Sequence, residues 1–247
     1  MRLATLRQKK SLILQDADSL CDAPGSHQIQ PAHFTPDYWR ERALITGEAP
    51  GRGSSLFLQP TPGASTQWVL RPYRRGGLIA TLSHSRYLWT GLERTRAFRE
   101  MRLTASLFAQ GLPVPRPIAA CVTRHGLTYE AALITQRIPG ARALADWLND
   151  ASLPDETLNQ VLASVGRMIR RFHDHGLDHV DLNARNILID NPGTPWLIDL
   201  DRCRLRHPGK WREANLQRLE RSLTKISAKP TGEWMKAIQD NYSLSIP

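Results

Sequence analysis

Polar residues in the segment HDHGLDHVDLNARNILID, residues 173–190, are of the types that carry out phosphoryl transfer. His179, Asp181 and Asn186 follow the pattern H-x-D-x-x-x-x-N, in which the carboxylate orients an acceptor hydroxyl and the amide oxygen holds a magnesium ion. The text that follows reads as a β-hairpin, whose second strand would carry the Asp199 carboxylate back beside Asn186. Oxygen ligands on opposed strands suit magnesium, so the spacing predicts a catalytic carboxylate at Asp181 and metal ligands at Asn186 and Asp199.

A metal-dependent hydrolase is the first alternative for this segment. His173, His175, Asp178 and His179 loosely match the H-x-H-x-D-H ligand pattern of metallo-β-lactamase-like hydrolases, but their spacing is one residue too long. Such a site also needs further histidines downstream, and only His207 follows. The sequence therefore disfavours a hydrolase.

An ordinary polar turn is the second alternative, because Asp and Asn are common turn formers. It would account for Asp181, Asn183 and Asn186, with Asp199 simply ending a strand. It would not account for the chemistry-bearing residues upstream, which occur in the order that a kinase requires.

Three of these upstream residues, Gly51, Gly53 and Ser54, lie in a Gly-rich turn, GRGSS, between two strand-like segments. Backbone amides in such a turn can approach phosphate oxygens closely. Arg71 ends the strand-like WVLR, and Glu100 falls on the helical pattern that follows. We therefore assign these five residues to nucleotide binding.

The elements that must position these residues follow from hydrophobic periodicity and turn signals. The first part of the chain reads as an antiparallel meander, then one helix and a further strand. The strands are predicted within residues 43–58, 68–71 and 131–138, and the helix runs from Thr90 as its N-cap to Gly111 as its stop. Later patterns predict helices at 141–150 and 154–176 and a hairpin at 186–201.

The element order predicts an α+β fold with two lobes. Residues 1–34 show no sustained period and are expected to form an irregular lead-in. Residues 35–136 are expected to form an N-terminal nucleotide-binding lobe with an antiparallel sheet and one helix. Residues 137–247 are expected to form a smaller, mostly helical C-terminal catalytic lobe.

Composition indicates a globular protein, since 41% of the 247 residues are hydrophobic. No window is apolar and long enough to span a membrane, and the start shows no signal-peptide pattern, so the cytosol is the expected compartment. Three widely spaced cysteines suggest neither a disulfide framework nor a zinc site.

The formal net charge is +10, and 27 of the 33 basic residues are Arg. The planar guanidinium suits phosphate oxygens, which favours a partner that carries phosphate or an anionic membrane face. A GC-rich genome could explain the ratio of Arg to Lys, but it would not explain the net charge.

Taken together, these motifs resemble the lipopolysaccharide-kinase branch of the protein-kinase-like superfamily. The resemblance rests on GEAPGRGSSLFL, VLRPYRRGGLIA, RAFREMRLTASLFAQGLPVPRPIAA, LITQRIPGA, HVDLNARNILID, WLIDLDRCRLR and NLQRLERS, which cover most of residues 46–222. Each element alone is weak, but the combination is specific. It implies a two-lobed protein-kinase-like fold that uses ATP with Mg²⁺.

The resemblance also implies a substrate and a location. The substrate would be a 3-deoxy-D-manno-octulosonic acid (Kdo) sugar on a lipid A precursor, phosphorylated at a hydroxyl expected to be O-4. The enzyme would act as a peripheral protein at the cytoplasmic face of a bacterial inner membrane, with no nucleic acid as partner. A kinase for a neighbouring core sugar, heptose, stays open as an alternative.

The sequence departs from the usual kinase pattern in two places. No Lys occurs between Lys10 and Lys210, and Arg71 sits where the strand lysine is expected. Arg71 would then meet the nucleotide phosphates and pair with Glu100. Asp199 is followed by Leu200 and Asp201 rather than Phe-Gly, which leaves open whether Asp201 is a further metal ligand or is solvated. We assign Asp201, like His179 and Asn183, a supporting role.

Other functional classes fit the sequence less well. Only 46 residues follow Asp201, too few for the large peptide-docking lobe of a protein kinase, and an antibiotic phosphotransferase would favour an acidic pocket. Residues 202–221 carry seven Lys/Arg with Trp211 among them, which predicts either a membrane-docking face or, with intramolecular pairing, no docking at all. A non-enzymatic basic module that binds membrane or nucleic acid is the remaining alternative.

Overall fold

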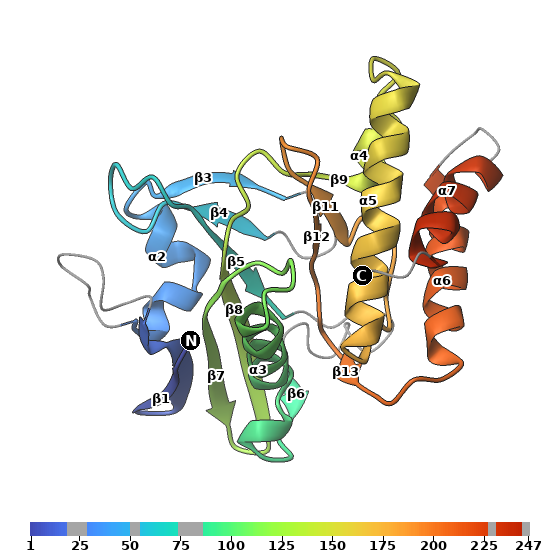
Figure 1. Ribbon diagram of the computed structural model, residues 1–247. Coiled ribbons are helices and arrows are strands. Elements are labelled where there is room, and N and C mark those ends of the chain that lie inside the picture. Colours follow the sequence, from blue (N-terminus) through green and yellow to red (C-terminus); the bar gives the residue numbers. More distant parts are fainter. Residues whose placement is uncertain (19–28, 50–54, 74–85, 227–230, 244–247) are drawn as a thin grey trace. The chain divides into compact units, whose positions relative to one another are not determined.

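The computed structural model describes residues 1–18, 29–49, 55–73, 86–226 and 231–243 (Figure 1). The chain forms two compact units. Unit 1 comprises residues 1–109 and 116–137, and unit 2 comprises residues 110–115 and 138–247.

The described part of unit 1 is built on one antiparallel sheet with the order β1-β2-β7-β8-β5-β4-β3, and β6 pairs with β8. The strands are β1 (Leu3–Gln8), β2 (Ser11–Asp16), β3 (Ile45–Glu48), β4 (Leu56–Leu58), β5 (Trp68–Pro72), β6 (Tyr87–Leu88), β7 (Pro117–His125) and β8 (Thr128–Gln136). The predicted meander is confirmed, since β3 pairs with β4 and β4 with β5.

The expectation of an irregular lead-in was wrong for the first sixteen residues, because β1 and β2 form a hairpin that extends the sheet. Ile13 and Leu14 are almost fully buried although they point to opposite faces. A strand covered on both faces shows a continuous apolar run instead of alternation. The edge strand β1 alternates between partly buried and exposed positions from Ala4 onward, but the buried strand β2 lacks the alternating pattern. Strand β7, which follows a Pro-rich segment and is also buried on both faces, was missed for the same reason.

Helices cover the two faces of this sheet. One face packs Ile13, Leu58 and Ile134 against Trp39 of helix α2 (Pro36–Arg40), which follows the short helix η1 (Pro31–Phe34). The other face packs Leu14 and Leu133 against helix α3.

Helix α3 (Arg96–Ala109) buries Phe98 and Met101 as the periodicity predicts. It begins later than expected, because a 3-10 turn, η3 (Leu92–Arg94), precedes it. Thr95 closes that turn by donating its hydroxyl to the Leu92 carbonyl at 2.6 Å. The predicted N-cap at Thr90 was therefore wrong. Thr90 and Thr95 are both of a residue type that favours the N-cap position, so the sequence alone did not distinguish them.

Unit 2 is mostly helical, as expected. Its helices are α4 (Leu144–Leu148), α5 (Asp155–Asp174), α6 (Trp211–Ile226) and α7 (Gly232–Ser243), and its short strands are β9 (Arg142–Ala143), β10 (Leu177–Asp178), β11 (Ile187–Ile189), β12 (Pro195–Leu197) and β13 (Arg204–Leu205). The predicted hairpin is present, because β11 pairs with β12 in antiparallel register.

Helices α5 and α7 pack side by side (Figure 1). Their close approach depends on Gly166, because a β-carbon built there would lie 2.3 Å from the backbone oxygen of Ile238. In the described part of the chain, no helix is both long and apolar enough to cross a membrane.

Candidate active site

Arg71 and Glu100 meet in unit 1, as the sequence predicts. Arg71 lies on β5 opposite Leu133 of β8, and its guanidinium bonds the Glu100 carboxylate, which projects from α3. Glu100 is almost completely buried, at 4% side-chain exposure, whereas Arg71 keeps 25%. The Glu100 side chain is therefore held inside unit 1, whereas the Arg71 guanidinium can still reach a ligand.

Tyr73 is a third member of this cluster that the sequence analysis missed. Its hydroxyl donates to the second carboxylate oxygen of Glu100, and the Arg71 guanidinium lies 4.9 Å from its ring centroid. Residues two apart on a strand share a face, so the spacing of Arg71 and Tyr73 was the available signal. With both of its oxygens engaged, Glu100 holds the Arg71 side chain in place.

The loop that contains Asp181 lies in unit 2, between β10 and β11. Asp181 is exposed, and two amides bracket its backbone: Asn183 and Asn186 each donate to the Asp181 carbonyl at 2.9 Å. The Asn183 side-chain oxygen in turn accepts from the backbone amides of Arg185, at 2.9 Å, and Asn186, at 3.2 Å. Asn183 thus shapes the loop, while the Asp181 carboxylate faces solvent and can approach a substrate.

His179 stabilises this loop through a buried contact. The ring is 2% exposed, and its Nε2 contacts the Ile198 carbonyl at 3.1 Å. Burial lowers the pKa of His179, and the bond to Ile198 acts in the opposite direction. A neutral imidazole therefore ties the loop that contains Asp181 to the residue that follows β12.

The hairpin brings Asn186 and Asp199 into one neighbourhood, as predicted. The Ile198 amide donates to the Asn186 carbonyl at 3.0 Å, so the residue before Asp199 is bonded directly to Asn186. Asp199 follows the end of β12 by two residues, and its positive φ of 60° turns the chain. Asp201 is half-buried and lies 3.9 Å from the Arg202 guanidinium.

The donor set on the hairpin fits magnesium. Asn186 uses its amide nitrogen on Asp181, which leaves its side-chain oxygen as the atom that could bind a cation. With the carboxylate of Asp199 it supplies two oxygen ligands, and magnesium typically takes only one or two from protein beside phosphate and water. Asn186 and Asp199 are therefore the candidate magnesium ligands.

A histidine metal site is not supported. His173 contacts the Tyr242 hydroxyl at 2.8 Å, His175 contacts the Arg171 carbonyl at 2.8 Å, and His179 faces Ile198. Across the described ranges, no three His, Cys, Asp or Glu side chains gather in a group that could hold a metal ion.

A second buried cluster anchors the segment just before the loop. Asp178, which is 6% exposed, accepts from Asn215 of α6 at 3.1 Å and pairs with Arg206 at 3.0 Å. The backbone amide of Ala184 also donates to Ser222 of α6, at 3.1 Å. Helix α6 therefore holds the segment that carries Asp181 at two points, one before it and one after it.

The surface predicted for membrane docking in residues 202–221 differs from expectation. Trp211 is only 8% exposed, packs 5.1 Å from the His173 ring and donates its indole N–H to the His207 carbonyl. Arg212 pairs with Asp174 at 3.3 Å. Trp211 is therefore a core residue, the first of the buried residues along α6. Several of the arginines in this segment pair with carboxylates within unit 2.

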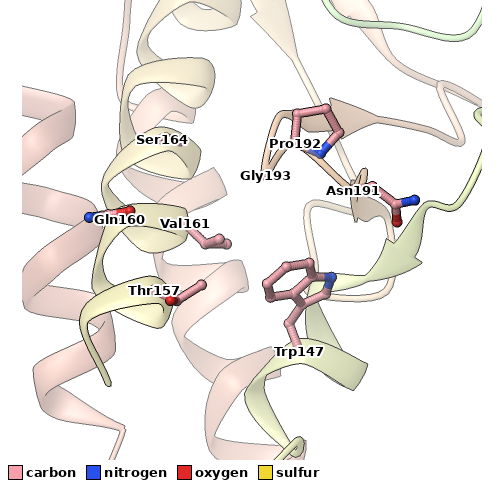
Figure 2. A pocket seen from close by; sticks show the side chains of 8 residues that line it. All are labelled: Trp147, Thr157, Gln160, Val161, Ser164, Asn191, Pro192 and Gly193. Carbon is pink, nitrogen blue, oxygen red and sulfur yellow. The ribbon is translucent and has the colours of Figure 1, made fainter. Parts of the chain in front are cut away.

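A pocket of about 200 Å³ in unit 2 lies between α4, the first turns of α5 and the β11–β12 turn (Figure 2). Its lining residues are Trp147, Thr157, Gln160, Val161, Ser164, Asn191, Pro192 and Gly193. None of them is charged or predicted to act on a nucleotide. The pocket is therefore unsuited to phosphate. Gly51, Gly53 and Ser54, predicted to line the nucleotide site, lie outside the described residues.

The sheet that carries the Arg71–Glu100 pair and the loop-and-hairpin unit that carries Asp181 define a protein-kinase-like phosphotransferase. Comparison with known proteins agrees with this class. Residues 36–240 match the model of the lipopolysaccharide kinase (Kdo/WaaP) family, and the chain belongs to this family.

Three relatives share the name 3-deoxy-D-manno-octulosonic acid kinase. The protein from Xylella fastidiosa strain M23 is 48% identical over 208 residues, covering 84% of this chain and 80% of the relative. The protein from Stenotrophomonas maltophilia strain K279a is 48% identical over 227 residues, covering 91% and 86%. The protein from Xanthomonas campestris pv. campestris strain B100 is 47% identical over 217 residues, covering 87% and 83%.

Proposed function

We propose that this kinase transfers the γ-phosphoryl group of ATP to a hydroxyl, O-4, of a Kdo sugar on a lipid A precursor, in lipopolysaccharide inner-core biosynthesis. The observation that carries the proposal is the shared name of relatives that align with more than four fifths of this chain. Asp181 supplies an exposed carboxylate suited to the reaction, and Asn183 and Asn186 hold its backbone carbonyl.

In the proposed mechanism, Asp181 orients the sugar hydroxyl and accepts its proton as the oxygen attacks the γ-phosphorus and ADP departs. Asn186 and Asp199 would hold Mg²⁺, which neutralises the charge of the phosphates when it is bound. His179 and Asn183 keep the loop in shape for this step, and we assign Asp201 a supporting place beside Asp199.

Arg71 takes the place of the usual strand lysine in this proposal. Its guanidinium would meet the nucleotide α/β phosphates, while Glu100 and Tyr73 fix its direction from inside unit 1. The Gly-rich turn with Gly51, Gly53 and Ser54 would contribute backbone amides to the same phosphates.

Direct assay tests the proposal. Purified protein with ATP and Mg²⁺ should add one phosphate, detected by mass spectrometry, to a lipid A precursor that carries Kdo and none to the same lipid without Kdo. NMR of the product should place the phosphate on O-4. Phosphorylation that requires heptose instead of Kdo would contradict the substrate assignment and favour the heptose alternative.

Because this substrate is an anionic lipid, we also propose that the protein works as a peripheral enzyme at the cytoplasmic face of the inner membrane. The net charge of +10 supports attraction to an anionic surface. Sedimentation of the protein with inner-membrane vesicles, and its release by salt, would test this location.

A further inference from the structure

Two hairpin turns lie together at one end of the unit 1 sheet. Lys9 and Lys10 form the turn between β1 and β2, and Gly126 and Leu127 form the turn between β7 and β8. The Arg124 amide donates to the Lys10 carbonyl at 3.0 Å, so the two turns are bonded to each other. Figure 1 shows the β7–β8 turn at the lower end of unit 1.

Two large apolar side chains project from this end. Leu127, at the turn, is 80% exposed, and Leu88 on the neighbouring β6 is 70% exposed. Leu88 pairs with Thr128, and the Trp89 amide donates to the Leu127 carbonyl at 2.9 Å, so both leucines belong to one patch. Among the described residues, no other large apolar side chain is as exposed as these two.

Basic side chains lie at the same end of the sheet as the patch. Lys9, Lys10 and Arg124 are exposed, and Arg124 also lies 4.8 Å from the Trp89 ring centroid. Arg86 is exposed as well and lies 3.7 Å from the Glu130 carboxylate. We name Lys9, Lys10, Leu88, Arg124 and Leu127, with Arg86, the hairpin-tip surface.

We propose that the hairpin-tip surface docks the protein on an anionic lipid bilayer. Leucines at protruding turns can enter the headgroup layer, while lysine and arginine at the same level meet lipid phosphates. A nucleic acid would match the charge but would leave Leu88 and Leu127 in water. The inference rests on the proposed function only in taking a membrane lipid as the substrate to be reached.

Vesicle binding tests the surface without any need for activity. Wild-type protein should co-sediment with vesicles of phosphatidylglycerol and phosphatidylcholine but not with phosphatidylcholine alone. Binding should weaken as salt is raised, because charges are screened within about 8 Å at physiological ionic strength. Lys9→Glu with Lys10→Glu should weaken binding roughly tenfold to a hundredfold, and Leu88→Ser with Leu127→Ser should weaken it at low and high salt alike.

Matched variants on unit 2 serve as controls. Lys210→Glu with Arg221→Glu makes the same charge change at exposed positions within residues 202–221, and Leu205→Ser removes an exposed leucine there. These variants should bind vesicles as the wild type does. The proposal is overturned if the Lys9/Lys10 variant binds normally, if the Lys210/Arg221 variant alone loses binding, or if wild-type protein ignores anionic vesicles.

Activity measurements separate this inference from the proposed function. The hairpin-tip variants should phosphorylate a soluble, deacylated Kdo acceptor at the wild-type rate and lose rate only on vesicle-borne lipid. Vesicle binding through this surface without phosphorylation of Kdo would refute the proposed function alone. Phosphorylation of Kdo lipid by hairpin-tip variants at the wild-type rate would refute the docking surface alone.

Discussion

Tyr73→Phe provides a quantitative test of the cluster that holds Arg71. The substitution removes one hydroxyl and leaves the ring, so it deletes the bond to Glu100 with little change in packing. Both residues are about 4% exposed, so water cannot replace the lost donor. Hydrogen bonds to charged groups contribute about 1.5–3 kcal/mol, and we expect a loss of about 2 kcal/mol in the free energy of unfolding.

Tyr129→Phe is the matched control. Tyr129 is also 4% exposed, but its hydroxyl accepts from the neutral backbone amide of Arg96, at 3.1 Å. Its loss should cost only about 1 kcal/mol. The difference between the two losses in unfolding free energy therefore measures how much the charge of Glu100 strengthens its hydrogen bond with Tyr73.

Thermal unfolding and steady-state kinetics measure the effect. About 2 kcal/mol corresponds to a drop in Tm of roughly 4–8 °C for a chain of this size. Because Arg71 loses part of its support, the apparent KM for ATP should also rise several-fold in Tyr73→Phe and stay unchanged in Tyr129→Phe. Equal destabilisation in both variants, with an unchanged KM, would show that Tyr73 does not hold the carboxylate that positions Arg71.

Four further predictions concern the site and the scaffold. Asp181→Asn should keep ATP binding and lower turnover by roughly a hundredfold or more, whereas Asp199→Asn should also weaken Mg-ATP binding; equal, mild losses in turnover assays would contradict both roles. Arg71→Ala should raise the KM for ATP and lower turnover. Arg71→Lys should give a lower KM and a higher turnover than Arg71→Ala, because a point charge still meets phosphate. Burial lowers the pKa of His173 to about 4, whereas in the unfolded chain it is near 6.5. Between these two pH values the unfolded chain binds a proton that the folded protein does not. The stability of the fold is therefore complete above pH 6.5 and falls as the pH is lowered toward 4. Urea unfolding should show a loss of about 2 kcal/mol between pH 7 and 5 that His173→Gln reduces. Gly166→Ala should destabilise the protein by about 1–3 kcal/mol in the same assay, because its methyl group would meet the backbone of α7; a neutral effect would mean that the helices separate at no cost.

Local sequence patterns predicted most of the elements that position the site. The pattern H-x-D-x-x-x-x-N followed by a turn predicted that the hairpin would return Asp199 beside Asn186, because a two-strand ladder leaves little freedom in where the chain comes back. The pairing of Arg71 with Glu100 was predicted through the family resemblance. Periodicity alone does not say which strand faces which helix.

Other features depend on contacts that are distant in sequence. Strand β2 lies between β1 and β7 and is buried on both faces, so it lacks the alternation that marks a half-exposed strand. Trp211 was misinterpreted from its basic surroundings, although its spacing with Asn215, Leu219 and Leu223, four residues each, marks the buried stripe of α6. The exposed leucines of the hairpin-tip surface are visible only once the turns are placed side by side.

The positive φ of Asp199 narrows what evolution can place at that position. Left-handed backbone is costly for most side chains, but Asn and Asp tolerate it better than other non-glycine residues. The backbone thus selects for nearly the same short oxygen-bearing side chains that a magnesium ligand requires. Glu would keep the negative charge but would meet neither requirement. It fits the left-handed backbone less well, and its carboxylate lies one methylene farther from the backbone. The backbone alone would therefore admit Asp, Asn and Gly at position 199, and the proposed magnesium ligand would require Asp among these three.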